Sequence, residues 1–486
     1  MPGTRLRVLS KFMEWAKNDP MRIFWLAGLA GTGKTSIAVT LCRMLQDEPD
    51  IMLGGAFFCS RTANVSELTD ARYIIPTLVV ALAEQSPIFA AALTAELAAD
   101  LRAALKPVSN QISILLQRPL KSLVPTPRSI IFIIDALDEC SDENEVRKIL
   151  QAISTFACDA SVKFIVTSRP ETHISTSPIS SSDRNSVLRL HTIDTSQVTE
   201  DIRLYVADAF SKSPLEESWY TESDVILLAG HADGLFIFAS TIIAYVLDTE
   251  SVEDRVARLR TVVNAMKDSQ VATGPLDAMY EFVLTRASDT KRVEPNELEA
   301  TRQVLACIAM ARMPLSIVAL AEILRRKPDV LRASLRRLRA VIHVPDEADQ
   351  PGLRMVHASF SDYLSDRAAA KLRVPAALGN ESLARGCLRV MDERLHFNVS
   401  QSHSSHAENS ATVPNTVNLS LEYACLQWIY HIDGLPQPWI MESDINLIFL
   451  PKILFWLEVM SVLGRVRRAA AMLIFAATAV RSQYRM

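Results

Sequence analysis

The chain has 486 residues, of which 49% are hydrophobic and 22% are charged, and its formal net charge is −4. This composition excludes a disordered or fibrous protein, because a chain so rich in apolar side chains can bury several cores. The small net charge gives no reason to expect a general affinity for nucleic acids or anionic membranes. Only 14 of the 486 residues are glycine, which is well below the usual frequency of about 7%. This scarcity of glycine disfavours all-β folds with many tight turns.

Apolar strands alternate with helices over the first 195 residues. An amphipathic helix is predicted at 4–19. Five short apolar runs are typical of buried strands, and they lie at 22–27, 55–59, 129–134, 163–167 and 186–191. Helical spacing is found at 35–46, 71–84, 87–104, 111–123 and 143–157, and a polar linker is expected at 175–185. This order predicts a parallel sheet covered by helices on both faces.

After residue 195 nearly every segment has helical spacing. Helices are predicted at 196–210, 221–229, 235–247, 252–268, 275–288 and 296–311. Two short helices follow between 314 and 344, the second of them basic at 330–340, and a hairpin is predicted from 342–344 and 354–357. This order is typical of a winged helix. The polar stretch 398–418 is expected to be a disordered loop, and the rest of the chain is expected to be helical.

A glycine-rich loop joins the first predicted strand to the following helix. Its residues are Gly28, Leu29, Ala30, Gly31, Thr32, Gly33, Lys34, Thr35 and Ser36, which match GxxxxGK[ST] at every fixed position. The glycines let backbone N–H groups turn toward phosphates, and the helix N-terminus adds its positive dipole end. Lys34 can reach the β- and γ-phosphates, and the Thr35 hydroxyl can ligate Mg²⁺. An incidental glycine-rich turn is disfavoured in a chain so poor in glycine.

Charged side chains follow two other predicted strands. Asp135 ends the run that begins at 129, and Asp138 and Glu139 come directly after it. A P-loop ATPase needs one acid at a strand end to hold Mg²⁺, and often a second acid to orient the attacking water. Asp135 suits the first task, and Glu139 or Asp138 suits the second, whereas acids that cap a helix are the alternative. Arg169 follows the next strand and can sense the γ-phosphate there, or else pair with the surface acids of a helix.

These motifs resemble the NACHT-type STAND NTPases, which are signal-transduction ATPases with numerous domains, and in particular their fungal NLR-like members. The matching segments are FWLAGLAGTGKTSIA at 24–38, GAFFCSR at 55–61, IIPTLVVALA at 74–83, IIFIIDALDEC at 130–140, KFIVTSRPE at 163–171, GLFIFASTII at 234–243 and HASFSDYLSD at 357–366. The resemblance implies an α/β P-loop NTPase domain, then a helical domain, a winged-helix-like domain and an all-α extension. The expected bounds are a flank at 1–20 and domains at 21–195, 196–290, 291–370 and 371–486.

The resemblance also implies roles for single residues. The segment 3–5 is expected to pass near the adenine, and 234–239 is expected to pack by the nucleotide, although Phe236 stands where the family has proline. His357 would contact the β-phosphate of bound ADP, unless it is only a hairpin residue bonded to Ser361 or Asp362. The basic helix at 330–340 is expected to be a solvated or interdomain face rather than a nucleic-acid contact.

A molecular switch that responds to ATP and ADP is the function that the resemblance implies. ADP would hold the domains together, and ATP would place its γ-phosphate against Arg169 and Lys34 and expose an oligomerisation surface. Slow Mg²⁺-dependent hydrolysis would reset the switch, and the partners would be further copies or related NACHT proteins. The alternative is a truncated scaffold or decoy that binds nucleotide and assembles with full-length relatives without turnover.

The spacing of the cysteines and the N-terminal sequence indicate the cellular compartment. The 7 cysteines include no pair at CxxC spacing, and the N-terminus lacks the apolar run of a signal peptide, so a cytoplasmic protein is expected. The most apolar segment, 469–480, is about 12 residues long and so too short to span a bilayer, and it is either a core helix or an interfacial anchor. No effector domain or repeat array is recognised, which suggests a partial gene model, a truncated paralogue or a regulator acting in trans.

Overall fold

The computed structural model of the chain describes most of its residues. Outside the described residues lie 1–2, 64, 124–128, 160–161, 181–185, 191–192, 213–218, 250, 269–273, 288–294, 369–371, 402–416 and 482–486. The chain divides into two units. The first comprises Met1–Arg61 and Val65–Leu276, and the second comprises Thr62–Asn64 and Asp277–Met486. The boundary at 276 therefore falls inside 196–290, the segment predicted as one helical domain.

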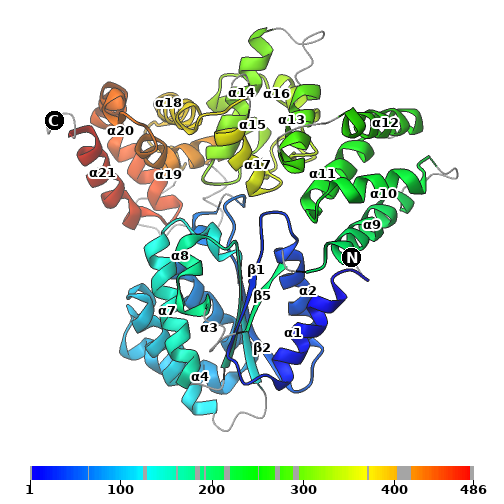
Figure 1. Cartoon of the computed structure of the whole chain (residues 1–486). Helices are drawn as coiled ribbons and strands as arrows, with labels where there is room; N and C mark the ends of the chain where they lie inside the picture. The colour runs from blue at the N-terminus through cyan, green and yellow to red at the C-terminus, as the bar shows by residue number, and fades with distance from the viewer. Residues whose placement is uncertain are drawn as a thin grey trace. The chain divides into compact units, whose positions relative to one another are not determined.

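A five-stranded parallel sheet lies at the centre of the first unit, as the apolar runs predict (Figure 1). The strands are β1 (Ile23–Ala27), β2 (Ile51–Phe58), β3 (Ser129–Asp135), β4 (Val162–Ser168) and β5 (Ser186–Arg189). Their order is β2-β3-β4-β1-β5. Because β3, β4 and β1 are neighbours and parallel, the residues that follow these three strands meet at one edge of the sheet.

The strand β2 is longer than the apolar run predicted at 55–59. It begins at Ile51, and its pairing with β3 shifts register between Leu53 and Gly55. A Cβ atom at Gly54 would lie 2.6 Å from the Phe132 ring, so this part of the strand needs glycine. The bulge interrupts the regular alternation of side chains, which is why the sequence pattern shows only the second half of the strand.

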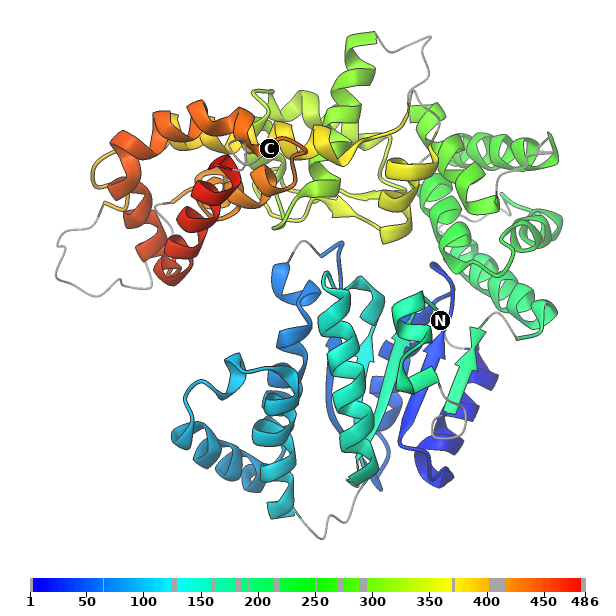
Figure 2. The ribbon, with the colours of Figure 1, turned by 60° about the vertical axis from the view of Figure 1, so that its left-hand side comes forward.

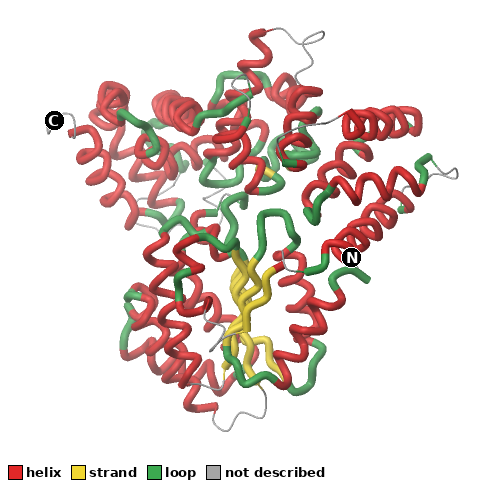
Figure 3. The backbone as a smooth tube through the Cα atoms, viewed as in Figure 1, coloured by secondary structure: helices red, strands yellow, loops and turns green. Residues whose placement is uncertain are grey.

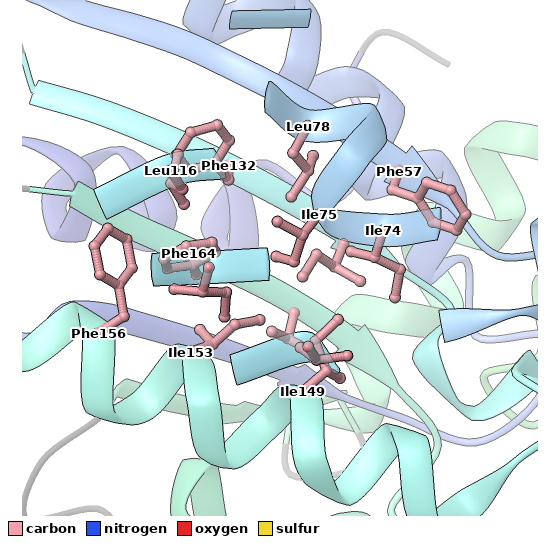
Figure 4. Close-up of a cluster of buried hydrophobic side chains, with 14 of the residues drawn as sticks. Phe57, Ile74, Ile75, Leu78, Leu116, Phe132, Ile149, Ile153, Phe156 and Phe164 are labelled. Atoms are coloured by element: carbon pink, nitrogen blue, oxygen red, sulfur yellow. The ribbon is translucent and has the colours of Figure 1, made fainter. Parts of the chain in front are cut away.

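Two hydrophobic clusters cover the two faces of the sheet. Successive apolar side chains of β3 alternate between them, so that Phe132 joins one cluster and Ile133 the other. The first cluster packs against α3 (Ile74–Gln85), α4 (Pro87–Ala99) and α7 (Glu143–Asp159). The second packs against α1 (Leu6–Asn18) and α2 (Lys34–Gln46). Figure 4 shows the first cluster, where the rings of Phe132 and Phe164 have centroids 5.3 Å apart.

Two of the predicted helices on this unit are wrong in their bounds. The helix predicted at 87–104 ends at Ala99, because Asp100 leaves the helical conformation. The helix predicted at 111–123 is divided into α5 (Val108–Gln111), a π-helical segment (Ile112–Gln117) and α6 (Arg118–Leu120). A 3-10 turn at Lys121–Leu123 follows α6, so residues 108–123 are helical throughout, and the prediction differs in where the helix starts and in its π-helical part.

The segment predicted as a polar linker at 175–185 is structured in its first half. The short helix α8 (Thr172–Ser175) is followed by a single turn of 3-10 helix at Pro178–Ser180. Ile179 of this turn is fully buried in the same cluster as Ile174. One apolar residue among serines therefore holds the segment against the sheet, and residues 181–185 lie outside the described part of the chain.

Four further helices complete the first unit. They are α9 (Thr195–Ser211), α10 (Glu222–His231), α11 (Phe236–Leu247) and α12 (Val252–Asp268), close to their predicted bounds. The helix α10 begins with a capping box, in which Thr221 and Asp224 each accept a hydrogen bond from the other's backbone N–H. The loop before α11 turns through Asp233 and Gly234, which both have positive φ. Figure 2 shows these helices from a second side.

The described residues of the second unit form helices and one small hairpin, joined by loops (Figure 3). Its first helices are α13 (Pro275–Ala287), α14 (Pro295–Met310), α15 (Ile317–Ile323) and α16 (Pro328–Arg336). The hairpin of β6 (Ile342–His343) and β7 (Arg354–Met355) is antiparallel, as predicted, and α17 (Ala358–Asp362) follows it. The last helices are α18 (Ala376–Arg394), α19 (Leu419–Asp433), α20 (Glu442–Val462) and α21 (Val466–Arg481). The basic helix predicted at 330–340 is α16, which begins at Pro328 and ends four residues early.

Both ends of the polar stretch predicted to be disordered at 398–418 are anchored. The backbone N–H of Ser400 donates to Glu458 at 2.9 Å, and its hydroxyl donates to the same oxygen at 2.6 Å. At the other end Asn418 caps α19 by accepting from the backbone N–H of Leu421 at 2.9 Å. The prediction is therefore wrong for these ends, and the central residues 402–416 lie outside the described part of the chain.

One helical stretch in the described residues is long and apolar enough to cross a membrane by length and composition. It covers Pro438–Val462, and 39% of its most apolar window is buried inside the protein. The core helix of a soluble protein can have the same properties, and Trp456 and Met460 of this helix are fully buried. The sequence pattern pointed instead to 469–480, because Lys452 and Glu458 interrupt the apolar run of α20. That segment forms most of α21, with Ala469, Met472 and Ala476 buried.

Candidate functional site

The predicted phosphate-binding residues 28–36 form one continuous loop and the first turn of α2. Gly31 and Gly33 have φ angles of 77° and 89°, in the left-handed region that favours glycine. The loop begins where the N–H of Gly28 bonds to the carbonyl of Ser168 at 3.1 Å, and the Thr32 hydroxyl donates to the carbonyl of Leu29 at 2.9 Å. The loop therefore has the conformation in which successive backbone N–H groups and a helix N-terminus can surround an anion.

Lys34 holds a buried positive charge at the centre of this loop. Its ammonium donates to the carbonyls of Gly28 at 2.9 Å and of Leu29 at 3.1 Å. Only 9% of the residue is exposed, and burial lowers the pKa of the ammonium more than the nearby carboxylates raise it. Two carbonyl oxygens satisfy part of the ammonium, and phosphate oxygens can take their place because they carry negative charge.

Asp135 lies at the end of β3 and has one unpaired oxygen. Its Oδ1 accepts a hydrogen bond from the Thr167 hydroxyl at 2.5 Å, and the same hydroxyl accepts from the N–H of Ala136 at 2.9 Å. Its Oδ2 is buried and has no hydrogen-bond partner in the described part of the chain. Burial raises the pKa of this carboxyl, although Thr167, the hydroxyl of Thr35 and the ammonium of Lys34 lower it. A buried carboxylate oxygen left open in this way fits a bound cation.

The donors around Asp135 fit Mg²⁺ better than a metal with an all-protein ligand set. No group of three or more His, Cys, Asp or Glu residues placed to hold a metal ion occurs in the part of the chain that the structure describes. Mg²⁺ commonly takes one or two protein oxygens and completes its shell with waters and phosphate oxygens. Asp135 and Thr35 stay the predicted ligands, and the Thr35 hydroxyl is among the groups that lower the pKa of Asp135.

Asp138 and Arg169 form an ion pair behind the loop. The carboxylate of Asp138 accepts from the backbone N–H of Arg169 at 2.9 Å and from its Nε at 3.2 Å. Asp138 is buried, so it is not one of the surface helix acids that were the alternative partner for Arg169. After burial, which has the largest effect, Asp138 raises and Arg169 lowers the pKa of Lys34, so both charges interact with this ammonium.

Glu139 has a different environment from Asp138. Its Oε2 accepts from the backbone N–H of Arg61 at 2.8 Å, and the Arg61 side chain donates to the carbonyl of Asp138 at 3.2 Å. Burial raises the pKa of Glu139, and the hydrogen bond from Arg61 opposes this. Asp138 uses both its oxygens to hold Arg169, whereas Glu139 is held through one oxygen. The two acids therefore differ in how many of their carboxylate oxygens are held by neighbouring groups.

Three residues of this site were missed by the sequence analysis. Thr167 joins β4 to the end of β3, Arg61 holds the Glu139 segment, and Ala136 has a φ angle of 53° between the two acids. A non-glycine residue with positive φ stores strain that surrounding bonds must hold, and the bond from Ala136 to Thr167 is one of them. A polar residue that ends an apolar strand next to an acid-bearing strand is the signal that could have identified Thr167.

The start of α11 packs directly on the phosphate loop. The N–H of Ile237 donates to the carbonyl of Gly31 at 3.1 Å. Arg5 donates to the carbonyl of Thr32 at 2.9 Å, and its guanidinium lies over the Phe236 ring at 4.9 Å from the centroid. The two segments that were expected near the nucleotide, 3–5 and 234–239, are thus brought together at the loop, and Phe236 fills the position of the family's proline.

Replacing Gly31 with alanine is expected to destabilise the first unit by at least about 2 kcal/mol. A Cβ atom there would lie 2.0 Å from Cγ2 of Ile237, and the φ angle of 77° adds strain for any other residue. Thermal unfolding would measure the loss. Gly230→Ala is the matched control: no atom lies within 4 Å of its Cβ position in α10, so this change should leave the stability unchanged or raise it. Equal melting temperatures for both variants would contradict the expectation.

His357 lies in the second unit, directly before α17. Its Nδ1 accepts from the backbone N–H of Ser359 at 3.1 Å and lies 2.7 Å from the Ser359 hydroxyl. Ser359 is therefore one local partner of His357, and Tyr280 bonds to the same hydroxyl at 2.8 Å. The predicted contact of His357 with a β-phosphate stays a prediction.

Comparison with known proteins agrees with the site. Residues 3–169 match the family described as Nephrocystin 3, N-terminal. The chain is also 23% identical over 490 residues to the vegetative incompatibility protein HET-E-1 of Podospora anserina, a match that covers 93% of this chain. These similarities support a NACHT-type STAND P-loop NTPase. The fungal relative is much longer than this chain, which spans 34% of it.

Two solved structures are similar to this chain. One is a STAND protein with a tetratricopeptide repeat sensor from Pyrococcus horikoshii, with 13% identity and a TM-score of 0.41 over 99% of this chain and 64% of the other. The second is a Walker-type ATPase from Pyrococcus abyssi, with 14% identity and a TM-score of 0.32 over 74% of this chain and 94% of the other.

Proposed function

We propose that the protein is an NLR-like signalling NTPase that binds ATP and ADP with Mg²⁺ and switches state with the nucleotide. The observation that carries this proposal is the charge arrangement at one edge of the sheet. Buried Lys34 sits in the phosphate loop, Asp135 has an unpaired buried oxygen beside Thr35, and Arg169 is held in place by Asp138. A purely structural loop has no need of the buried charges of Lys34, Asp135 and Asp138, because each costs desolvation energy.

Each residue would have a distinct task in this function. Lys34 would exchange the carbonyls of Gly28 and Leu29 for oxygens of the β- and γ-phosphates, and the loop N–H groups would hold the rest of the phosphate chain. Asp135 and Thr35 would hold Mg²⁺, which supplies positive charge to the phosphate oxygens. Glu139 would orient the attacking water, so that slow hydrolysis returns the protein to its ADP state.

Arg169 would report which nucleotide is bound. In the structure its Nε and backbone N–H are held by Asp138, so the ion pair and a γ-phosphate compete for the same side chain. A nucleotide can shift the equilibrium between two states only by binding them with different affinity. The contact that ATP makes with Arg169 and ADP does not make would supply this difference in affinity.

The biological setting is proposed from the relatives. The name of the Podospora protein supports a role in recognition of self and non-self in fungi, carried out by cytoplasmic assemblies of further copies or related NACHT proteins. The alternative function is a scaffold or decoy that binds nucleotide and assembles with longer relatives without turnover.

Two measurements on the whole chain test the switch. The nucleotide that co-purifies is identified by mass spectrometry, and size exclusion compares the protein in ADP with the protein in a non-hydrolysable ATP analogue. We expect bound ADP, a small species in ADP and a larger one with the analogue. Identical monomers in both nucleotides would contradict the switch, and assembly that is independent of nucleotide would favour the scaffold.

A further inference from the structure

Two cysteine thiols face each other beside the acids of the site. Cys59 directly follows β2 and Cys140 directly follows Glu139, so they are 81 residues apart in the chain. The thiol of Cys140 donates to Sγ of Cys59 at 3.6 Å, and both residues are free cysteines. Cys59 is buried and Cys140 is half-buried. The pair therefore has one thiol that an oxidant can reach and one thiol in contact with it.

Backbone hydrogen bonds beside the two cysteines position Asp135 and Glu139. The N–H of Cys59 donates to the carbonyl of Asp135 at 3.0 Å, which ties the end of β2 to the acidic strand end. Two residues later, the N–H of Arg61 holds the Glu139 carboxylate at 2.8 Å. On the other side, Cys140 is the next residue after Glu139, and the N–H of Ser141 bonds to the carbonyl of Thr69 at 2.8 Å. A bond between the two sulfur atoms would therefore shift the backbone segment that positions Glu139.

We propose that Cys59 and Cys140 form a reversible disulfide under oxidation by peroxide, and that this disulfide slows nucleotide turnover while the phosphate loop still binds nucleotide. The effect on turnover rests on the proposed NTPase function, whereas formation of the bond does not.

The chemistry balances with one hydrogen peroxide per pair. The thiolate of Cys140 attacks a peroxide oxygen to give a sulfenic acid and one water. The thiol of Cys59 then attacks the sulfenic sulfur, the S–S bond forms, and a second water leaves. The two thiols lose two electrons and two protons in total, and dithiothreitol reverses the reaction by thiol exchange. Cys140 is the more exposed of the two thiols, which agrees with Cys140 reacting first.

The other described cysteines do not offer this reaction. Cys307, Cys387 and Cys425 are fully buried in the second unit, and burial raises the pKa of each thiol, that of Cys307 to about 12. Cys42 lies in α2, and its pKa is raised to about 11, mainly by burial. Of the thiols that the structure describes, Cys140 therefore combines partial exposure with a second thiol in direct contact.

The bond would move the Glu139 segment. A disulfide needs its sulfur atoms about 2.05 Å apart, so closure from 3.6 Å requires a shift of more than about 1 Å at Cys59 or Cys140. Misplacement by about 1 Å at a catalytic group can reduce the rate about 100-fold. The phosphate loop follows β1, whereas the disulfide would join the ends of β2 and β3, so the contacts of Lys34 would remain.

The test treats the full chain with a stoichiometric amount of hydrogen peroxide. Free thiols are then alkylated, and peptide mass spectrometry locates the disulfide. Turnover and the affinity for a fluorescent ADP analogue are measured before and after treatment. We expect a Cys59–Cys140 peptide, a fall in turnover of about 10-fold or more that dithiothreitol reverses, and an affinity within about twofold of the reduced protein.

Serine variants separate this pair from general oxidation. Cys140→Ser and Cys59→Ser should each remove the inhibition by peroxide, whereas Cys42→Ser should keep it. Separate alkylation of Cys59 and Cys140 after peroxide, or a mapped disulfide that leaves turnover unchanged, would overturn the proposal. A reduced protein without any turnover would contradict the proposed function instead, and the peptide map would still decide whether the disulfide forms.

Discussion

Replacing Lys34 with alanine is expected to weaken nucleotide binding by at least about 100-fold and to leave the protein folded. Two charge-assisted hydrogen bonds from the ammonium to phosphate oxygens are worth about 1.5–3 kcal/mol each, and both would be lost. The folded state now carries a buried ammonium whose pKa is lowered by burial, so the charged form is less favourable there than in the unfolded chain. Alanine removes this cost near neutral pH, and the melting temperature should stay the same or rise. Binding of a fluorescent ADP analogue and thermal unfolding would measure both effects.

Lys163→Ala is the matched control for Lys34. Lys163 is also a buried lysine that donates to carbonyls, those of Trp15, Ala16 and Asp19 at 2.8, 3.0 and 2.8 Å. These carbonyls lie at the end of α1 rather than in the phosphate loop, so the loss of Lys163 should leave nucleotide affinity unchanged. If Lys34→Ala binds ADP as tightly as the wild type, the phosphate loop is not the nucleotide site.

The sequence predicts the sheet and the loop because their signals are local. Buried parallel strands are continuous apolar runs, and the phosphate loop needs glycine at positions set by its own backbone. The elements that were misplaced depend on features with no local pattern. The first half of β2 is concealed by a bulge at Gly54 and Gly55, and the helix predicted at 111–123 starts earlier and contains a π-helical segment at Ile112–Gln117.

The site was harder to predict than the loop because its contacts join distant segments. Thr167 reaches Asp135 only because β4 lies beside β3, and Gly31 is close to Ile237, which follows it by more than 200 residues. The choice between Asp138 and Glu139 could not be made from their order in the chain. Their environments depend on contacts with distant segments: Asp138 accepts from the N–H of Arg169, which follows β4, and Glu139 accepts from the N–H of Arg61, which follows β2.

The acid that orients water can be identified by comparing Glu139→Gln with Asp138→Asn. Glutamine at 139 is expected to reduce turnover by about 10²–10⁴-fold, because it cannot accept a proton from the attacking water, and to keep nucleotide affinity within about twofold. Only the ionised carboxylate of Glu139 can accept this proton. Because burial raises the pKa of Glu139, turnover by the wild type should fall with decreasing pH at a pH above the usual range of a glutamate.

Asp138→Asn should give a different dependence of turnover on pH. Both oxygens of Asp138 are held by Arg169, so asparagine weakens the ion pair and releases the arginine without removing the group that contacts the water. Turnover by Asp138→Asn should change less than turnover by Glu139→Gln. The Asp138→Asn variant should still lose activity at low pH, whereas the residual activity of Glu139→Gln should not fall at low pH. Turnover as a function of pH, measured for both variants at saturating ATP and Mg²⁺, decides between them. A larger loss in Asp138→Asn, together with disappearance of the acid limb there, would assign the water to Asp138.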